Sequence, residues 1–150
     1  MNQEECKKET KQHIGNVQIL MLDIIHDLIN RAHDHDLSKL ESPELETFTE
    51  FTPKLKQSTY GSKEYGDFLK NMKGALDHHY KTNRHHPEHF SNGIKGMNLV
   101  DVIEMICDWK ASSMRHSNGN IEKSIEMNQE RFGYSDDLKQ ILLNTIKDYF

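Results

Sequence analysis

The chain has 150 residues, enough for one ordinary domain with its own core. Its net charge of -5 argues against general nucleic-acid binding and against a polybasic membrane anchor. No apolar run approaches the roughly 20 residues of a membrane-spanning helix, and two cysteines, Cys6 and Cys107, are too few for a disulfide framework. We therefore expect a cytoplasmic protein that does not enter a membrane.

Helical spacing of apolar residues begins near the N-terminus. A first helix is predicted from about Glu4 to Ala32, with one apolar face made by Val17, Leu20, Ile24 and Leu28. Ser42 followed by Pro43 predicts a helix start, since Ser caps and Pro fits the first helical position. This short second helix is expected to end before Pro53.

Four more helices are predicted along the rest of the chain. They run from about Ser62 to Lys81, Asn98 to His116, Ile121 to Arg131 and Ser135 to Tyr149, with Asn118-Gly119 ending the second of these four. Their expected inward residues include Met72, Leu76, Leu99, Val102, Ile103, Ile106, Ile125, Leu138, Ile141, Leu142 and Ile146. No segment alternates with a period of two. The prediction is one all-α domain over residues 1–150, an irregular bundle of about six helices.

Histidine is unusually common in this chain. Ten of the 150 residues are His, and most lie in clusters: His33 and His35, His78 and His79, and His85, His86 and His89. Imidazole is the commonest metal ligand in proteins, so the clusters predict a metal site, with solvent-exposed histidines as the alternative.

Two parts of the first helical region offer ligands. His13 precedes Val17 by four residues and is predicted on the inward face, where an ordinary core histidine is the alternative. His35-Asp36 follows the helix, and adjacent imidazole and carboxylate suit a divalent first-row metal. It is preferred over the other His-Asp pairs because Lys39 follows, which could hold a phosphoryl oxygen or steady a metal-bound water.

Further ligands are expected on later helices. His79 shares a helical face with Met72 and Ala75, whereas His78 is rotated away, so His79 is the predicted ligand. Asp108 lies in an apolar stretch, where a buried carboxylate needs a partner. Glu104, one turn earlier, could accept a hydrogen bond from a ligand imidazole, whereas Asp101 is predicted on a solvated acidic face.

The order His, His-Asp, His, Asp resembles the signature of the HD-domain metal-dependent phosphohydrolase superfamily. Residues 35–43, HDLSKLESP, are similar to the HDxGKxxxP segment of the HD-GYP branch, with Ser in place of Gly. The GYP sequence itself is absent, and residues 83–89, NRHHPEH, stand in the loop instead. The chain also resembles an uncharacterised, often phage-encoded helical family marked by HDxSK, by this His-His-Pro-Glu-His loop and by EMxxDWK.

The resemblance implies a phosphohydrolase in which a divalent metal lowers the pKa of the attacking water. One or two ions of Mn, Fe, Co, Ni, Zn or Mg would be held by His13, His35, Asp36, His79 and Asp108. Asp36 and Lys39 are the predicted catalytic residues. Substrate contacts are expected from Asn83, Arg84, His85, His86 and Lys110, with a ligand role for His85 or His86 as the alternative. The substrate would be a nucleoside monophosphate or a small cyclic nucleotide.

Two other functions stay open. One is a metal-binding helical adaptor without turnover. The other, which the acidic net charge disfavours, is nucleic-acid binding by the loop of residues 81–95. A homodimer also stays open, and a phage-encoded chain would act in the host cytoplasm.

Overall fold

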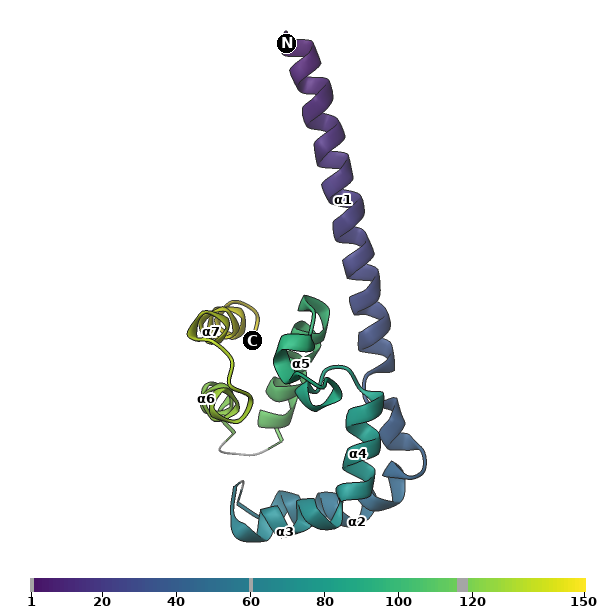
Figure 1. Cartoon of the computed structure of the whole chain (residues 1–150), viewed down its shortest axis with the longest axis vertical. Coiled ribbons are helices and arrows are strands. Elements are labelled where there is room, and N and C mark those ends of the chain that lie inside the picture. Colours follow the sequence, from purple (N-terminus) through teal and green to yellow (C-terminus); the bar gives the residue numbers. More distant parts are fainter. Residues whose placement is uncertain (1, 60, 116–118) are drawn as a thin grey trace. The chain divides into compact units, whose positions relative to one another are not determined.

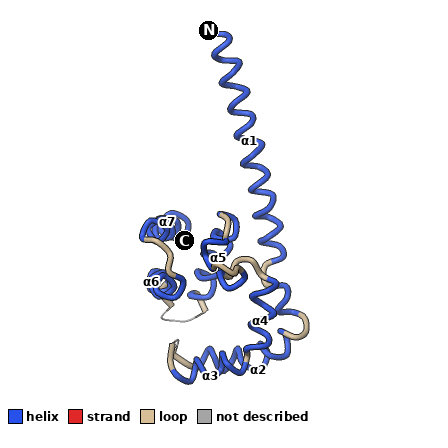
Figure 2. The backbone as a smooth tube through the Cα atoms, viewed as in Figure 1, coloured by secondary structure: helices blue, strands red, loops and turns tan. Residues whose placement is uncertain are grey.

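The computed structural model describes residues 2–59, 61–115 and 119–150. These residues form helices and connecting loops without a strand (Figure 2), which confirms the predicted all-α class. Seven α-helices are described, close to the expected six. The chain divides into two units, one ending at His35 and one from Asp36 to Phe150, and the single domain over 1–150 stays a prediction. The predicted helix end at His116 and the stop at Asn118 lie outside the described residues.

The first unit is one long helix, α1 (Gln3–Asp34), close to the predicted boundaries (Figure 1). Its start is defined by a capping box, in which the Asn2 side chain accepts from the Glu5 backbone N–H and the Glu5 side chain accepts from the Asn2 N–H. With 32 residues the helix is about 48 Å long. No membrane-spanning candidate occurs among the described helices, because none combines sufficient length with sufficient apolar character.

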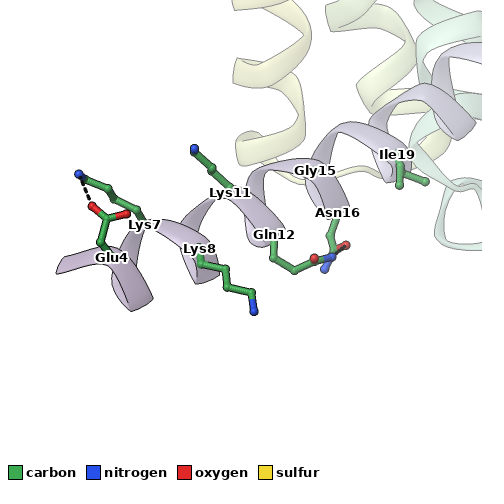
Figure 3. A pocket seen from close by; sticks show the side chains of 8 residues that line it. All are labelled: Glu4, Lys7, Lys8, Lys11, Gln12, Gly15, Asn16 and Ile19. Carbon is green, nitrogen blue, oxygen red and sulfur yellow. Dashed lines mark hydrogen bonds and ion pairs between the residues drawn. The ribbon is translucent and has the colours of Figure 1, made fainter. Parts of the chain in front are cut away.

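A hollow lies along the N-terminal half of α1 (Figure 3). Its lining includes Lys7, Lys11 and Ile19, and Lys7 pairs with Glu4 at 2.9 Å. Because all lining residues come from one helix, the hollow is an open groove between exposed side chains. It does not enclose a ligand site.

The second unit begins with the short 3₁₀ helix η1 (Leu37–Leu40), followed by α2 (Glu44–Gln57), α3 (Lys63–Asn71) and α4 (Lys73–Thr82). Helix α2 packs against both η1 and α4. This brings the start of α2 and the end of α4 close to Asp36.

Three predicted boundaries in this region are wrong. The Ser42 side chain does not cap α2, whose N-cap is Pro43. Helix α2 continues through Pro53, because the lost backbone bond concerns the exposed Thr49 carbonyl, which water can reach. The helix predicted from Ser62 to Lys81 breaks at Met72, beside the weak helix formers Asn71 and Gly74.

Two 3₁₀ turns, η2 (Pro87–His89) and η3 (Gly93–Gly96), lead into α5 (Leu99–Ser113). Helix α6 (Ile121–Phe132) ends at Gly133, whose φ of 66° lies in the left-handed region that glycine adopts freely. Helix α7 (Asp136–Tyr149) starts after Ser135, which caps it, and so begins close to the predicted position. The last two helices therefore match their predicted ranges closely.

An apolar core joins α5, α6 and α7. Its buried members are Ile106, Ile125, Tyr134, Leu142 and Ile146. The Tyr134 hydroxyl donates to the Ile125 carbonyl at 2.5 Å, and burial raises the pKa of Tyr134 to about 12. The prediction of inward-facing apolar residues is only partly confirmed, since Leu99, Ile103 and Ile141 are exposed.

Candidate metal centre

Asp36 opens the second unit in an uncommon backbone conformation. Its φ of 58° is left-handed, which Asp tolerates better than most non-glycine residues. The turn is closed by the Lys39 N–H, which donates to the Asp36 carbonyl at 2.9 Å. The Lys39 ammonium also pairs with Asp36 Oδ2 at 2.5 Å. The lysine thus holds one carboxylate oxygen while Oδ1 lies toward the histidines.

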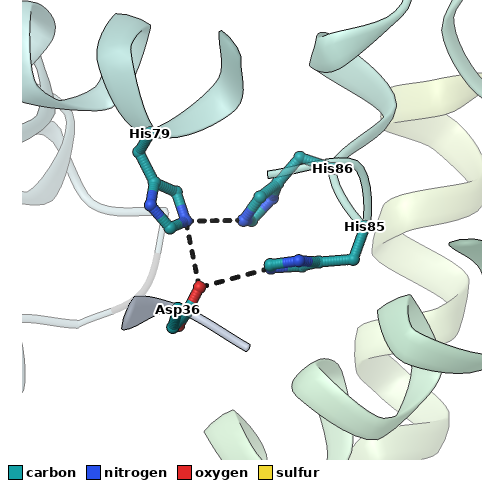
Figure 4. Close-up of side chains that lie close together, drawn as sticks. All are labelled: Asp36, His79, His85 and His86. Atoms are coloured by element: carbon teal, nitrogen blue, oxygen red, sulfur yellow. Dashed lines mark hydrogen bonds and ion pairs between the residues drawn. The ribbon is translucent and has the colours of Figure 1, made fainter. Parts of the chain in front are cut away.

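Three histidines lie around Asp36: two contact its Oδ1, and the third contacts one of these two (Figure 4). His79 lies in the last turn of α4, whereas His85 and His86 come from the loop before η2. His79 Nε2 lies 3.3 Å from Asp36 Oδ1 and 2.9 Å from His86 Nε2, and His85 Nε2 lies 3.5 Å from Asp36 Oδ1. We call Asp36, His79, His85 and His86 the histidine cluster.

The spacing of the cluster fits a shared cation. Two ligand nitrogens at a right angle, each about 2.1 Å from one ion, are about 3 Å apart. The distances of 2.9 to 3.5 Å between the cluster atoms lie near this value. A donor set of three imidazoles and one carboxylate suits Mn, Fe, Co, Ni or Zn better than Mg, which prefers an oxygen-only shell.

Carboxylates lie behind two of the rings. Glu44 Oε2 lies 2.8 Å from His79 Nδ1, and Glu104 Oε1 lies 3.0 Å from His85 Nδ1. Asn83 Nδ2 also lies 3.0 Å from His79 Nδ1, but its two hydrogens go to the Ser38 hydroxyl and the His79 carbonyl. Because an ionised carboxylate only accepts hydrogen bonds, His79 Nδ1 carries the proton that Glu44 accepts. The His79 Nε2 then keeps a lone pair facing the cluster, as in carboxylate–histidine–metal arrangements.

Burial keeps two of the imidazoles neutral. It lowers the pKa of His79, with the positive charge of Lys39 as a further cause. Burial also lowers the pKa of His86 to about 2, with smaller contributions from His85, His79 and Lys39. A neutral imidazole retains the lone pair that a metal requires, so the lowered pKa values favour both rings as ligands.

Asp108 extends this arrangement on another side. Asp36, His85 and Asp108 each offer a ligand atom within 4.8 Å of the others. Asp36 and His85 therefore belong to both sets of donors.

The predicted metal ligands fall into two groups. Asp36, His79 and Asp108 lie together in the second unit. His13 lies on α1, and His35 is the C-cap of α1 and the chain neighbour of Asp36, so both belong to the first unit. Ligand roles for His13 and His35 stay predictions.

The residues predicted to bind substrate have different surroundings. His85 and His86 lie within the cluster, which favours their alternative role as ligands. Asn83 donates to the Ser38 hydroxyl at 2.8 Å and to the His79 carbonyl at 2.9 Å, so it braces the end of α4. Lys110 lines a surface hollow near the end of α5. Substrate contacts by these residues stay predictions.

Arg84 and Asp101 form a bidentate ion pair. Arg84 Nε and Nη2 lie 3.1 and 3.0 Å from the two oxygens of Asp101. Asp101 is fully buried and also accepts from the Asn98 backbone N–H, so its predicted solvated position is wrong. A charged side chain can take a buried place when its partners replace water, which helical spacing alone does not reveal.

The sequence analysis missed Glu44. It is fully buried, and its carboxylate contacts His78 as well as His79. As one glutamate among several in an acidic segment, it carries no local signal of burial. Only the packing of α2 against α4 distinguishes it from Glu46, which is exposed.

Comparison with known proteins gives one family and no closer relative. No curated protein and no solved structure matches the chain significantly. The profile of a family of unknown function, DUF5662, matches residues 2–148, almost the whole sequence. The chain therefore belongs to the DUF5662 family.

Proposed function

We propose that the chain is a divalent-metal-dependent phosphohydrolase of the HD type that acts on a nucleotide. The observation that carries the proposal is the convergence of the His79, His85 and His86 Nε2 atoms with Asp36 Oδ1. The resemblance of residues 35–43 to the HD-GYP motif adds the phosphoester class. The substrate in this proposal is a nucleoside monophosphate or a small cyclic nucleotide.

The histidine cluster would hold the metal, and Asp108 would take part beside Asp36 and His85. His35 and His13 remain proposed additional ligands from the first unit. When bound, a divalent cation lowers the pKa of a water and offsets negative charge on a phosphoryl oxygen. In the reaction the water oxygen bonds to phosphorus, the ester P–O bond breaks, and a proton goes to the leaving oxygen.

Lys39 has two tasks in this proposal. Its ammonium holds Asp36 Oδ2, which directs the other oxygen toward the imidazoles. Since its side chain is partly exposed, the same charge is available to a phosphoryl oxygen approaching the cluster. Asn83 keeps His79 in place through the bond to its backbone carbonyl.

The test is a screen of purified protein, loaded separately with Mn, Co, Ni, Zn or Mg, over nucleoside monophosphates and cyclic nucleotides. Phosphate release reports on monoesters, and chromatography of the linear product reports on cyclic diesters. We expect turnover with at least one transition metal and its loss after chelation.

The matched variants are Asp36→Asn and Asp34→Asn. Asn keeps the size of Asp36 and tolerates its backbone conformation. We expect a loss of about 100-fold or more in kcat/KM, since metal assistance contributes several kcal/mol. Asp34 belongs to the neighbouring His-Asp pair and is exposed, so Asp34→Asn should leave kcat/KM unchanged. Turnover that survives chelation contradicts the proposal, and metal binding without turnover on any substrate favours the adaptor.

A further inference from the structure

The buried carboxylate of Glu44 joins two adjacent histidines of which only one belongs to the cluster. Glu44 Oε1 lies 2.7 Å from His78 Nδ1, and Oε2 lies 2.8 Å from His79 Nδ1. The Glu44 side chain is 0% exposed, the His79 side chain 2% and the His78 side chain 42%. A carboxylate in such a position requires strong partners, and both of its oxygens have one.

This contact determines which nitrogen of His79 carries the proton. Because the carboxylate only accepts, His79 donates from Nδ1, and its Nε2 keeps the lone pair. That Nε2 is the atom near His86 Nε2 and Asp36 Oδ1. The other tautomer would place a hydrogen where a metal ligand is needed.

The same contact separates His78 from the cluster. Consecutive helical residues point about 100° apart, and Glu44 holds both Nδ1 atoms on its own side. His78 is thereby held at the carboxylate and away from the cluster. The buried His79 is held by the same carboxylate, but its Nε2 faces the cluster. Glu104 on α5 lies near a second ring of the cluster, with its Oε1 at 3.0 Å from His85 Nδ1.

We propose that Glu44 is a positioning residue that makes His79, through its Nε2, a ligand of the metal centre. This inference rests on the proposed function only for the presence of the metal. The ring orientation and tautomer are properties of the metal-free chain as well.

The first experiment measures the His79 ring nitrogens by long-range ¹H–¹⁵N NMR in the metal-free full chain. We expect the wild type to carry the proton on Nδ1 and the Glu44→Gln variant to show a mixture of tautomers. A glutamine offers one acceptor and one donor, so it can no longer accept from both rings. A wild-type His79 protonated on Nε2 overturns the proposal even if every variant fails to fold.

The second experiment measures Mn²⁺ and Zn²⁺ affinity by competition with a chelating dye. We expect the affinity to fall about 10-fold in Glu44→Gln and about 100-fold in Glu44→Leu, which has no acceptor. Glu46→Gln, on the same helix but exposed, is the matched control and should change affinity less than about 2-fold.

The two proposals fail in different ways. Unchanged affinity in both folded Glu44 variants, with normal binding by the wild type, overturns the role of Glu44 alone. A wild type that binds neither metal overturns the proposed function together with the metal-directing role of Glu44. A circular dichroism melt of each variant identifies any that have lost their fold, and the wild-type tautomer then decides.

Discussion

The second unit contains two interiors of opposite character. Between α5, α6 and α7 the buried side chains are almost all apolar, and they exclude water without further partners. Between η1, α2, α4 and the loop before η2, buried histidines face carboxylates. The first interior stabilises the fold by itself. The second contains the polar groups that hold the cation in the proposed function. Stability and function are therefore expected to respond to different substitutions.

The largest expected effect on stability comes from the apolar interior. Leu142→Ala should lower the free energy of unfolding by about 2–5 kcal/mol, because it leaves a cavity at a side chain that is 2% exposed. Chemical denaturation measures this change. Ile141→Ala, its exposed neighbour on α7, is the control and should change stability by less than about 0.5 kcal/mol. A loss of metal affinity in Leu142→Ala would show that the two interiors are not independent.

Metal addition should stabilise through the polar interior alone. A cation that binds only the folded chain, at 100 times its Kd, adds about 2.7 kcal/mol to the free energy of unfolding. Urea denaturation with and without Zn²⁺ measures this gain. The His86→Ala variant should lose most of it, since one imidazole of the cluster is removed. An equal gain in wild type and variant would place the bound metal elsewhere.

Acid should weaken the metal-free protein because of the same imidazoles. The pKa of His86 is lowered to about 2 in the folded chain, so the unfolded chain binds the proton first as pH falls below about 6.5. The free energy of unfolding should then fall by about 1.4 kcal/mol for each pH unit. Denaturation between pH 7.5 and 4.5 measures the slope, which His86→Asn should reduce. A slope unaffected by this substitution contradicts the burial of a neutral His86.

The smallest effect is expected where the two interiors are joined at the surface. Arg131 on α6 pairs with Glu88 in η2 at 2.5 Å, and the Arg131 side chain is half exposed. Exposed ion pairs contribute about 0.2–1 kcal/mol, so Arg131→Ala should lower stability within that range. The measurement is a urea titration at low and at high salt. A much larger loss would mean that this pair couples the two interiors.

The apolar interior was the more predictable of the two. Helical spacing placed Ile106, Ile125, Leu142 and Ile146 correctly, since a buried stripe repeats along one helix. The same spacing wrongly predicted Leu99 and Ile103 as buried. Apolar residues cover a wide surface of α5, and the sequence does not reveal which of them pack on neighbouring helices.

The polar interior could be predicted only in part. The residue types of Asp36, His79 and Asp108 predicted side chains that would gather at one site, and these side chains do lie in the two donor sets. The composition around His85 and His86 predicted a loop there. Glu44 and Asp101 gave no such signal, because their burial depends on contacts between segments distant in sequence. Local pattern identifies the atoms that suit a metal, but packing decides which carboxylates support them.

The backbone at Asp36 has a consequence for how this position tolerates variation. A left-handed φ of 58° strongly disfavours β-branched and bulky residues, whatever their chemistry. Glycine, asparagine and aspartate fit, yet only aspartate also brings a negative charge. In a saturation library at this codon, the variants with glycine or asparagine should therefore be the most stable, and most others should lose about 1–2 kcal/mol. Aspartate alone should combine an undiminished stability with full metal loading.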